Sequence, residues 1–403
     1  MHVARTCAAA ALPLLLALGC GRPVAPPATP VPTATPEPVA VAEPVVAPEP
    51  EPVVVVLAAV GDVLPHRRVK ATAAALGWAE VFGDAVPLLQ AADIAFANLE
   101  SPIAPDHHQR IYDEVFDAPA DLAPALAAAG IDLVSTANNH AYDQGPDGLV
   151  ETWTRVREAG VAVAGTGPTC AEAQAPRVVE VRGVRVGFLA FTDLANFDRN
   201  AGPDAPCLSV TGPLCTADCG PDRDAVPFSH DTDRLKAAIA SVDADFVVVS
   251  LHWGFEHSVD PLPDDPALAR ALIDAGADVV LGHHPHVLQP VEVHAAPDGR
   301  TGVIAYSLGN FVSNMAEQWK PGDDPAKART RDGLLLQVPL EWRGPGDTRV
   351  GTPVAVPLWT ENQPDRITVR TLEALAPELA AARRTETRRI VGPSVPDAAA
   401  ARP

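Results

Sequence analysis

The 403-residue sequence lacks an excess of positive charge, and this excludes several classes of partner. It contains 30 Lys and Arg residues against 51 Asp and Glu residues, which gives a formal net charge of -21 at pH 7. So acidic a chain is poorly suited to bind nucleic acid or to lie flat on an anionic lipid surface. We therefore expect no nucleic-acid partner.

The amino-terminal region lacks an apolar run long enough to cross a bilayer comfortably. Residues 8–18 are apolar, follow a short basic region with Arg5, and end in Ala17-Leu18-Gly19-Cys20. This is the form of a secretory signal rather than a transmembrane helix. The small residue before Cys20 resembles the lipobox of bacterial lipoproteins. We expect residues 1–20 to direct export across the inner membrane and Cys20 to carry a lipid anchor in the bacterial cell envelope, with plain secretion as the alternative.

Residues 21–52 lack the apolar residues needed to bury a core. They consist almost entirely of Pro, Ala, Val, Thr and Glu, as in the run Pro48-Glu49-Pro50-Glu51-Pro52. Such a composition predicts a disordered, partly polyproline II spacer between the anchor and the folded domain. A partner-binding proline motif is the alternative, but no aromatic residue accompanies these prolines.

The sequence also lacks a CxxC pair, which disfavours a structural zinc site. Once the leader is removed and Cys20 is lipidated, four cysteines remain, at positions 170, 207, 215 and 219. In an exported protein an even number favours two disulfides, and three pairings are open. A structural zinc site that uses these cysteines remains the alternative.

No internal repeat of fixed period is present, so a solenoid or propeller is not expected. From Val53 onward, short β-branched and apolar runs alternate with Ala- and Leu-rich stretches of helical period. This pattern predicts an α/β protein with a largely buried sheet. We predict a single domain over residues 53–342 and a partly disordered C-terminal extension over residues 343–403, with a short helix near 372–389.

Polar residues follow six of the predicted strands at their carboxyl ends, where open α/β sheets place ligand sites. The strand endings carry Asp62, Glu100, Asn138-Asn139-His140, His252, His283-His284-Pro285-His286 and Asn310. A single Asp or Asn in this position is usually a turn former or a helix cap. Six endings that together supply carboxylates, amides and several imidazoles point instead to a shared site.

The residue types favour a divalent metal ion. Carboxylate oxygens, an amide oxygen and neutral imidazoles are ligands for Zn, Mn, Fe or Ca, and no thiolate accompanies them. Histidine clusters can also be buried and hydrogen-bonded without metal, and this alternative is strongest for His283. The sequence therefore predicts one or two divalent cations without distinguishing among these metals.

The ordered motifs resemble those of the bacterial CapA family of capsule, or poly-γ-glutamate, synthesis proteins. The motifs are GD at 61–62, NLESP at 98–102, ANNHAYDQG at 137–145, HWGFEH at 252–257, GHHPHVLQPVE at 282–292 and YSLGNFV at 306–312. The resemblance spans roughly residues 53–338. It implies a calcineurin-like metallophosphatase fold, which is a β-sandwich of two sheets flanked by helices.

By this resemblance, each polar residue is given an expected role. The metal ligands would be Asp62, Glu100, Asn139, His252, His284 and His286, and His140 would be the catalytic histidine, with Asp143 and Glu256 supporting the imidazoles. Asn138 and Asn310 would bind substrate, or else anchor the loops that carry them. Trp253, with Phe255, would form a pocket wall, or else pack in the core.

Two departures from the superfamily pattern affect these expectations. Leu64 stands where the first motif has a second ligand histidine, and Glu100 stands where the second motif has Asp. They leave open both the number of metal ions and whether the reaction is phosphoester cleavage.

Three functions follow from this pattern. The first is a metal-dependent hydrolase that acts on an envelope polymer, peptide or phosphoester, with the metal polarising the scissile group and His140 protonating the leaving group. The second is a non-catalytic lipoprotein that assists the assembly or export of an anionic capsular polymer, together with capsule-synthesis proteins. The third is metal-assisted proton abstraction at a peptide Cα.

Overall fold

The computed structural model describes residues 51–108, 115–197, 200–215 and 230–398, together with the isolated positions 25 and 29. The chain divides into one unit of residues 1–49 and a second, compact unit of residues 50–403. The predicted leader, Cys20 and nearly all of the predicted spacer lie outside the described residues. Among the helices of the described part, none is long and apolar enough to span a membrane.

The first sheet has the strand order β18-β17-β15-β1-β2-β3-β4. Its centre is β1, which runs parallel to β2 and antiparallel to β15, while β14 extends the pairing of β1 and β16 pairs with β15. The strands are β1 (Val53–Val63), β2 (Ile94–Leu99), β3 (Leu133–Ser135), β4 (Ala162–Ala164), β14 (Asn310–Val312), β15 (Asp332–Gly344), β16 (Asp347–Val350), β17 (Val354–Asn362) and β18 (Ile367–Thr371).

The second sheet has the order β12-β13-β11-β10-β7-β6, with β9 beside β7. Its central strands β13, β11, β10 and β7 are parallel, which places their carboxyl ends along one edge. A short β5–β8 pair stands apart. The strands are β5 (Thr166–Gly167), β6 (Arg177–Val181), β7 (Val184–Leu194), β8 (Cys207–Leu208), β9 (Val210–Cys215), β10 (Phe246–His252), β11 (Val279–His283), β12 (Val291–Ala295) and β13 (Thr301–Ala305).

The helices begin and end at residues that favour helix termini. In α5 and α8 a proline lies in the first turn, and the Thr169 side chain caps α6 by accepting a hydrogen bond from the Glu172 amide. The helices are α1 (Arg67–Leu76), α2 (Trp78–Phe82), α3 (Val86–Gln90), α4 (Leu122–Ala128), α5 (Gly145–Glu158), α6 (Cys170–Gln174), α7 (Thr232–Ala240), α8 (Asp265–Asp274) and α9 (Pro377–Val391).

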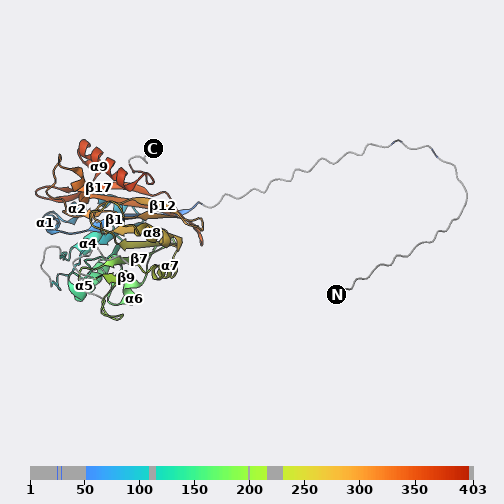
Figure 1. Cartoon of the computed structure of the whole chain (residues 1–403), viewed down its shortest axis with the longest axis horizontal. Helices are drawn as coiled ribbons and strands as arrows, with labels where there is room; N and C mark the ends of the chain where they lie inside the picture. The colour runs from blue at the N-terminus through green and yellow to red at the C-terminus, as the bar shows by residue number, and fades with distance from the viewer. Residues whose placement is uncertain are drawn as a thin grey trace, which may run out of the picture. The chain divides into compact units, whose positions relative to one another are not determined.

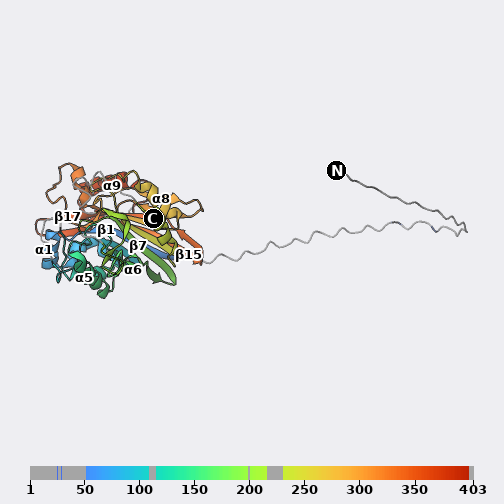
Figure 2. The same ribbon diagram turned by 60° about the horizontal axis from the view of Figure 1, so that its bottom comes forward.

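The two sheets pack face to face, and helices cover their outer faces. Because successive strand side chains point to opposite faces, Leu57 of β1 joins the core between the sheets with Phe96 and Val248, whereas Ala58 joins the core beneath the helices. The second sheet buries Val247 and Val249 against α7 and α8 in the same way. Figures 1 and 2 show this arrangement, with α9 and α5 at opposite ends of the folded unit. This architecture confirms the predicted α/β sandwich of two sheets flanked by helices.

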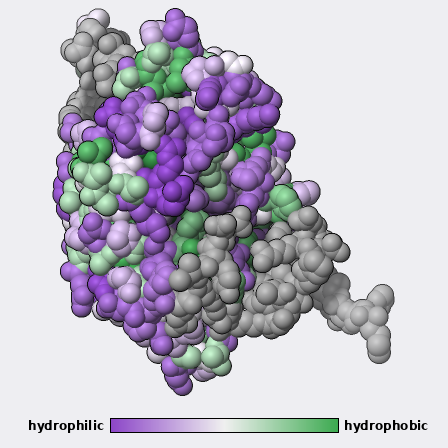
Figure 3. All heavy atoms as spheres, turned by 90° about the vertical axis from the view of Figure 1, so that its left-hand side faces the viewer, coloured by the Kyte–Doolittle hydropathy of each residue, from purple (hydrophilic) through white to green (hydrophobic). Residues whose placement is uncertain are grey.

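The face of the unit at the left of Figure 1, which carries α1, is covered mainly by hydrophilic side chains (Figure 3). Apolar residues are scattered on it rather than gathered in one broad patch. Such a surface is typical of a protein whose large apolar residues are mostly buried in its core.

The predicted domain end at residue 342 differs from the structure. β17 and β18 extend the first sheet beyond β15, and α9 follows them. The helix predicted near 372–389 corresponds to α9 at Pro377–Val391. Residues 343–398 therefore complete the sheet, because β15 would otherwise present an unpaired edge in the middle of the fold.

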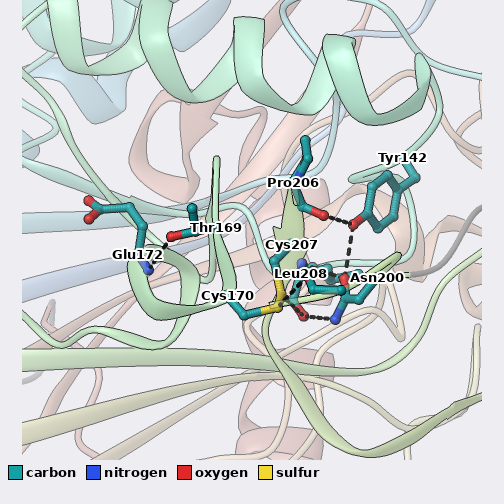
Figure 4. Close-up of a disulfide and its surroundings, with 9 residues drawn as sticks. Tyr142, Thr169, Cys170, Glu172, Asn200, Pro206, Cys207 and Leu208 are labelled. Atoms are coloured by element: carbon teal, nitrogen blue, oxygen red, sulfur yellow. Dashed lines mark hydrogen bonds between the residues drawn. A yellow bond between two sulfur atoms is a disulfide. The ribbon is translucent and has the colours of Figure 1, made fainter. Parts of the chain in front are cut away.

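A disulfide joins Cys170, at the start of α6, to Cys207, at the start of β8. This bond agrees with one of the three pairings that the sequence left open. Because it uses two of the four cysteines, it excludes a zinc site that needs all four. The Cys215 side chain and Cys219 lie outside the described residues. Close to the disulfide, the Tyr142 hydroxyl lies 2.9 Å from both Asn200 Oδ1 and the Pro206 carbonyl oxygen (Figure 4). The disulfide therefore fixes Cys207 next to Pro206, whose carbonyl oxygen contacts Tyr142. Tyr142 lies two residues after His140.

Candidate metal centre

The carboxyl ends of strands from both sheets meet at one place between the sheets. From the first sheet come Asp62 of β1 and Glu100, which directly follows β2; from the second come His252 at the end of β10 and His284 directly after β11. Parallel neighbours deliver their carboxyl ends to the same edge, so the side chains converge.

The six residues predicted as metal ligands lie together. His252 Nε2 lies 2.9 Å from Asn139 Oδ1 and 3.3 Å from Glu100 Oε1. On the other side of Glu100, His286 Nδ1 lies 3.2 Å from Asp62 Oδ2, and His286 Nε2 lies 3.8 Å from Glu100 Oε1.

Among the residues that the structure describes, three groups have ligand atoms within 4.8 Å of one another and could hold a metal ion. The first is Glu100, His252 and His284, and the second is Asp62, Glu100 and His286. The third, Glu256, His284 and His286, includes an exposed carboxylate. The first two groups share Glu100, so the site offers two adjacent cation positions around one carboxylate.

The state of Glu100 shows that a cation fits this site. Its side chain is fully buried, and within the described structure neither carboxylate oxygen has a hydrogen-bond partner. Burial, and then the negative charges of Asp62, Glu256 and Asp143, raise the pKa of Glu100 well above its ordinary value. A buried carboxylate without partners is costly, and a bound cation removes that cost.

The imidazoles are suited to bind a metal at neutral pH. Burial, and then the nearby His284, lower the pKa of His252 well below its ordinary value. Burial, and then His286, lower the pKa of His284 to about 3. Both rings are therefore neutral near pH 7 and keep a nitrogen lone pair for coordination.

Asp62 is kept ionised by its neighbours. Burial alone would raise its pKa, but close contacts with His283 and His286 hold the pKa well below its ordinary value. His283 Nδ1 lies 3.3 Å from Asp62 Oδ1, and the Asn98 amide donates a 2.9 Å hydrogen bond to the same oxygen.

Asn98 was not among the predicted site residues, although it stands at the end of β2 in the NLESP motif. Its amide nitrogen also lies 3.3 Å from His252 Nδ1, so it contacts a residue from each of the two sheets. The signal for it was present in the strand ending, but its neighbour Glu100 was the more obvious ligand type.

The backbone that carries His284 and His286 is strained. Both residues have positive φ, 98° and 56°, which is uncommon for residues with a side chain. Such outliers cluster at functional sites, where the surrounding structure enforces them. Close approach is also required at Gly61, because a Cβ there would lie 1.8 Å from the Gly309 carbonyl oxygen. These features explain why the GD and LGN motifs have glycine beside the site.

His140 and Asp143 form a buried pair next to the metal residues. His140 Nδ1 lies 2.8 Å from Asp143 Oδ2, and the Phe116 amide donates a 2.6 Å hydrogen bond to the same oxygen. The Phe116 ring packs edge-on against His140, with ring centroids 4.4 Å apart. A carboxylate acceptor fixes the proton of neutral His140 on Nδ1 and leaves Nε2 for proton transfer.

Phe116 and His66 are further site residues that sequence reasoning missed. The His66 ring also packs edge-on against Phe116, with centroids 5.1 Å apart. Burial, and then the charges of His286 and His140, lower the pKa of His66 to about 4. Neither residue belongs to a strand ending, so the pattern that identified the other site residues could not include them.

The predicted substrate-binding residues have mainly structural contacts. The Asn138 amide donates to the Leu99 carbonyl oxygen at 2.9 Å, and the Asn310 amide donates to the Thr330 carbonyl oxygen at 2.9 Å. Asn310 Oδ1 also lies 3.1 Å from His286 Nδ1. These contacts favour the alternative that both residues anchor their loops.

Trp253 does not line a pocket. Its side chain is fully buried in the core beneath α7 and α8, where the indole donates a 3.0 Å hydrogen bond to the Tyr306 carbonyl oxygen. The alternation that points His252 into the site points its neighbour Trp253 away from it. The predicted pocket wall is therefore wrong for Trp253, whereas Phe255 is 41% exposed.

Comparison with known proteins identifies relatives. Residues 56–315 match the sequence model of a family described as "Bacterial capsule synthesis protein PGA_cap". The "Capsule biosynthesis protein CapA" of Bacillus anthracis is 33% identical over 295 residues, which cover 72% of this chain and 65% of that protein. The "PGA biosynthesis protein CapA" of Bacillus subtilis is 30% identical, over 75% of this chain and 72% of that protein. A solved structure described as a novel phosphatase from Mycoplasma pneumoniae has a TM-score of 0.42 and 14% identity, over 78% of this chain and 96% of that one.

Proposed function

Because the chain belongs to the PGA_cap family of bacterial capsule synthesis proteins, we propose that it is a metal-dependent hydrolase of the cell envelope. Its substrate would be a capsular polymer, a peptide or a phosphoester. The observation that carries this proposal is Glu100, a fully buried carboxylate with no hydrogen-bond partner in the described structure, which lies among the imidazoles of three histidines.

In this proposal the residues divide the work between binding and proton transfer. Asp62, Glu100, Asn139, His252, His284 and His286 would hold one or two divalent cations, which would supply Lewis-acid activation of a phosphoryl or carbonyl group. Asn98 and His283 contact Asp62 and keep its oxygens in place. No thiolate contributes, so the donor set suits Zn, Mn or Fe.

His140 would move the proton. With Nδ1–H held by Asp143, protonated His140 can donate from Nε2 to a leaving group and then become neutral. The Phe116 ring packs edge-on against the imidazole and would help to keep it in place. Proton transfer by His140 needs both the Asp143 carboxylate and the Phe116 ring to be held in place. The ring is supplied by residues 115–118.

The cellular setting belongs to the same proposal. Residues 1–20 would direct export, Cys20 would attach the chain to the membrane, and residues 21–52 would hold the folded unit away from that membrane. The relatives named for capsule or PGA biosynthesis support capsule-synthesis proteins as partners.

A second candidate is a non-catalytic lipoprotein that assists the assembly or export of an anionic polymer. The observation that favours it is the wording of the relatives' names, which describe biosynthesis rather than hydrolysis. The net charge of -21 would repel a polyanion unless cations lie between them.

Metal content separates the two candidates. Elemental mass spectrometry of the purified protein is compared with the Asp62→Ala/His284→Ala double variant, and both are assayed on bis(p-nitrophenyl) phosphate, a γ-glutamyl anilide and poly-γ-glutamate. A hydrolase binds metal in the wild type, loses it in the double variant and cleaves one of these substrates in parallel. A folded wild type that stays metal-free after incubation with Mn, Zn or Ca contradicts the proposal and leaves the second candidate.

A further inference from the structure

We propose that Glu256 is a further metal ligand, which joins His284 and His286 on the solvent side of the cation position formed by Asp62, Glu100 and His286. This inference rests on the proposed metal site, and it assigns Glu256 to direct coordination rather than to support of an imidazole. It also gives the site a ligand that can leave when substrate arrives, since the carboxylate is exposed.

Room for another ligand follows from the donor set. The group Glu100, His252 and His284 has Asn139 beside it, so that position can reach four protein donors. The group Asp62, Glu100 and His286 has three donors and only one imidazole. Leu64, on the segment after Asp62, is buried and apolar and supplies nothing. Catalytic metal sites use three or more protein donors, and a further position is filled by water, substrate or another ligand.

Glu256 lies beside His286, the imidazole of that three-donor group. Its carboxylate oxygen lies within 4.8 Å of ligand atoms of both His284 and His286. His286 is in turn 3.2 Å from Asp62 and 3.8 Å from Glu100, so the same imidazole joins Glu256 to the buried carboxylates.

The backbone holds Glu256 in this place even though its side chain is exposed. After β10 the chain turns at Gly254, which has a φ of 87°, and His257 has a positive φ of 64°. The His257 amide donates a 2.8 Å hydrogen bond to the carbonyl oxygen of Pro285, the residue between His284 and His286. The loop that carries Glu256 is thus attached directly to the loop that carries the two imidazoles.

Glu256 differs from an ordinary surface carboxylate of this chain. Glu292 is paired with Arg270 through two hydrogen bonds of 2.8 and 2.9 Å and accepts another from the Tyr306 hydroxyl. Glu256, by contrast, makes no hydrogen bond or ion pair with any described residue.

The test measures metal binding by the full-length protein rather than its activity. Metal-free wild type, Glu256→Gln and Asp260→Asn are titrated with MnCl₂ by calorimetry, and the bound Mn is counted by elemental mass spectrometry. Asp260 is an exposed carboxylate four residues further along the same loop, so its variant removes the same charge nearby. Thermal midpoints without metal show that all three proteins are folded.

The wild type and Asp260→Asn are expected to bind two Mn per chain. Glu256→Gln is expected to lose one Mn or to bind it on the order of 10-fold or more weakly, while the other Mn is unaffected. Unchanged stoichiometry and affinity in Glu256→Gln overturn this inference but leave the proposed hydrolase intact. An equal loss in Asp260→Asn also overturns it, because the effect is then general charge. A wild type that binds no metal overturns both proposals.

Discussion

His140 Nδ1 lies 2.8 Å from Asp143 Oδ2, and both side chains are buried beside the candidate metal residues. The carboxylate accepts from Nδ1 and so holds the imidazole in one tautomer and one orientation. This contact lies outside the metal ligands, so it can be removed without removing the metal.

Asp143→Asn is therefore expected to lower the kcat of phosphodiester or amide hydrolysis by about 10²- to 10⁴-fold. The amide cannot stabilise the imidazolium and can reverse the direction of the hydrogen bond. Steady-state assays on the best substrate from the screen, together with metal analysis, make the measurement. Asp147→Asn, an exposed carboxylate in the first turn of α5, is the control and should keep wild-type turnover. Loss of metal in Asp143→Asn would instead show a structural role.

Glu100→Gln is expected to stabilise the metal-free protein at neutral and higher pH. Because the folded-state pKa of Glu100 is raised, stability from this carboxyl is present below its unfolded-state pKa and is lost as the pH rises through the folded-state pKa. The neutral amide avoids that loss, with a gain of roughly 1–3 kcal/mol in the free energy of unfolding. The gain should disappear in acid.

Urea unfolding of the metal-free proteins between pH 5 and 9 checks this, with exposed Glu180→Gln as a control expected to change stability by no more than about 0.5 kcal/mol. Added Mn or Zn should reverse the order, because wild type gains stability from binding and Glu100→Gln does not. A Glu100→Gln protein less stable than wild type at every pH would show that Glu100 has a structural partner.

The strands and their polar endings could be predicted because both are local features. The β-branched run of β1 and the His-rich ending of β11 can each be recognised in the sequence from a window of about ten residues. The convergence of Asp62 with Glu100 followed from the parallel-strand rule, whereas their meeting with His286 of the other sheet was implied only by the family resemblance. Pairings across long separations could not be predicted, and β15 beside β1 is an example.

Residues 343–398 were misjudged because proline and glycine dominate the start of that segment. Pro357 lies inside β17 and pairs with Leu334, a place where proline usually argues against a strand. For Trp253 both a pocket wall and core packing were expected, and strand alternation, which points it to the face opposite His252, decides for the core. In both cases tertiary packing decided what local composition could not.

Removal of the Cys170–Cys207 disulfide is expected to destabilise the fold without affecting the metal. The bond closes a loop with a sequence separation of 37, for which chain entropy predicts a loss of about 3–4 kcal/mol. Urea unfolding of Cys170→Ser/Cys207→Ser measures it, and reductant should lower wild-type stability toward that of the variant while leaving the variant unchanged. A variant as stable as the wild type would contradict a role for the bond in anchoring α6 to β8.

The C-terminal helix is joined to the centre of the first sheet by a buried ion pair. Arg383 Nε donates a 2.9 Å hydrogen bond to Asp332 Oδ1, and the two side chains are only 1% and 2% exposed. Burial raises the pKa of Asp332 to about 7, although Arg383 opposes this rise. Loss of the arginine would leave the carboxylate buried without its partner.

Arg383→Met is therefore expected to lower the free energy of unfolding by about 3–5 kcal/mol at pH 8. The loss should be smaller at pH 5, because a carboxyl with a raised folded-state pKa contributes stability at low pH and loses it as the pH rises. Arg384→Met is the matched control, since the neighbouring Arg384 pairs with Glu373 and Asp397 nearer the surface and should cost about 1 kcal/mol or less. Equal, small effects of both substitutions at both pH values would mean that α9 is dispensable. A large and pH-dependent effect of Arg383→Met alone would show that residues 343–398 are part of the cooperative fold that supports the site.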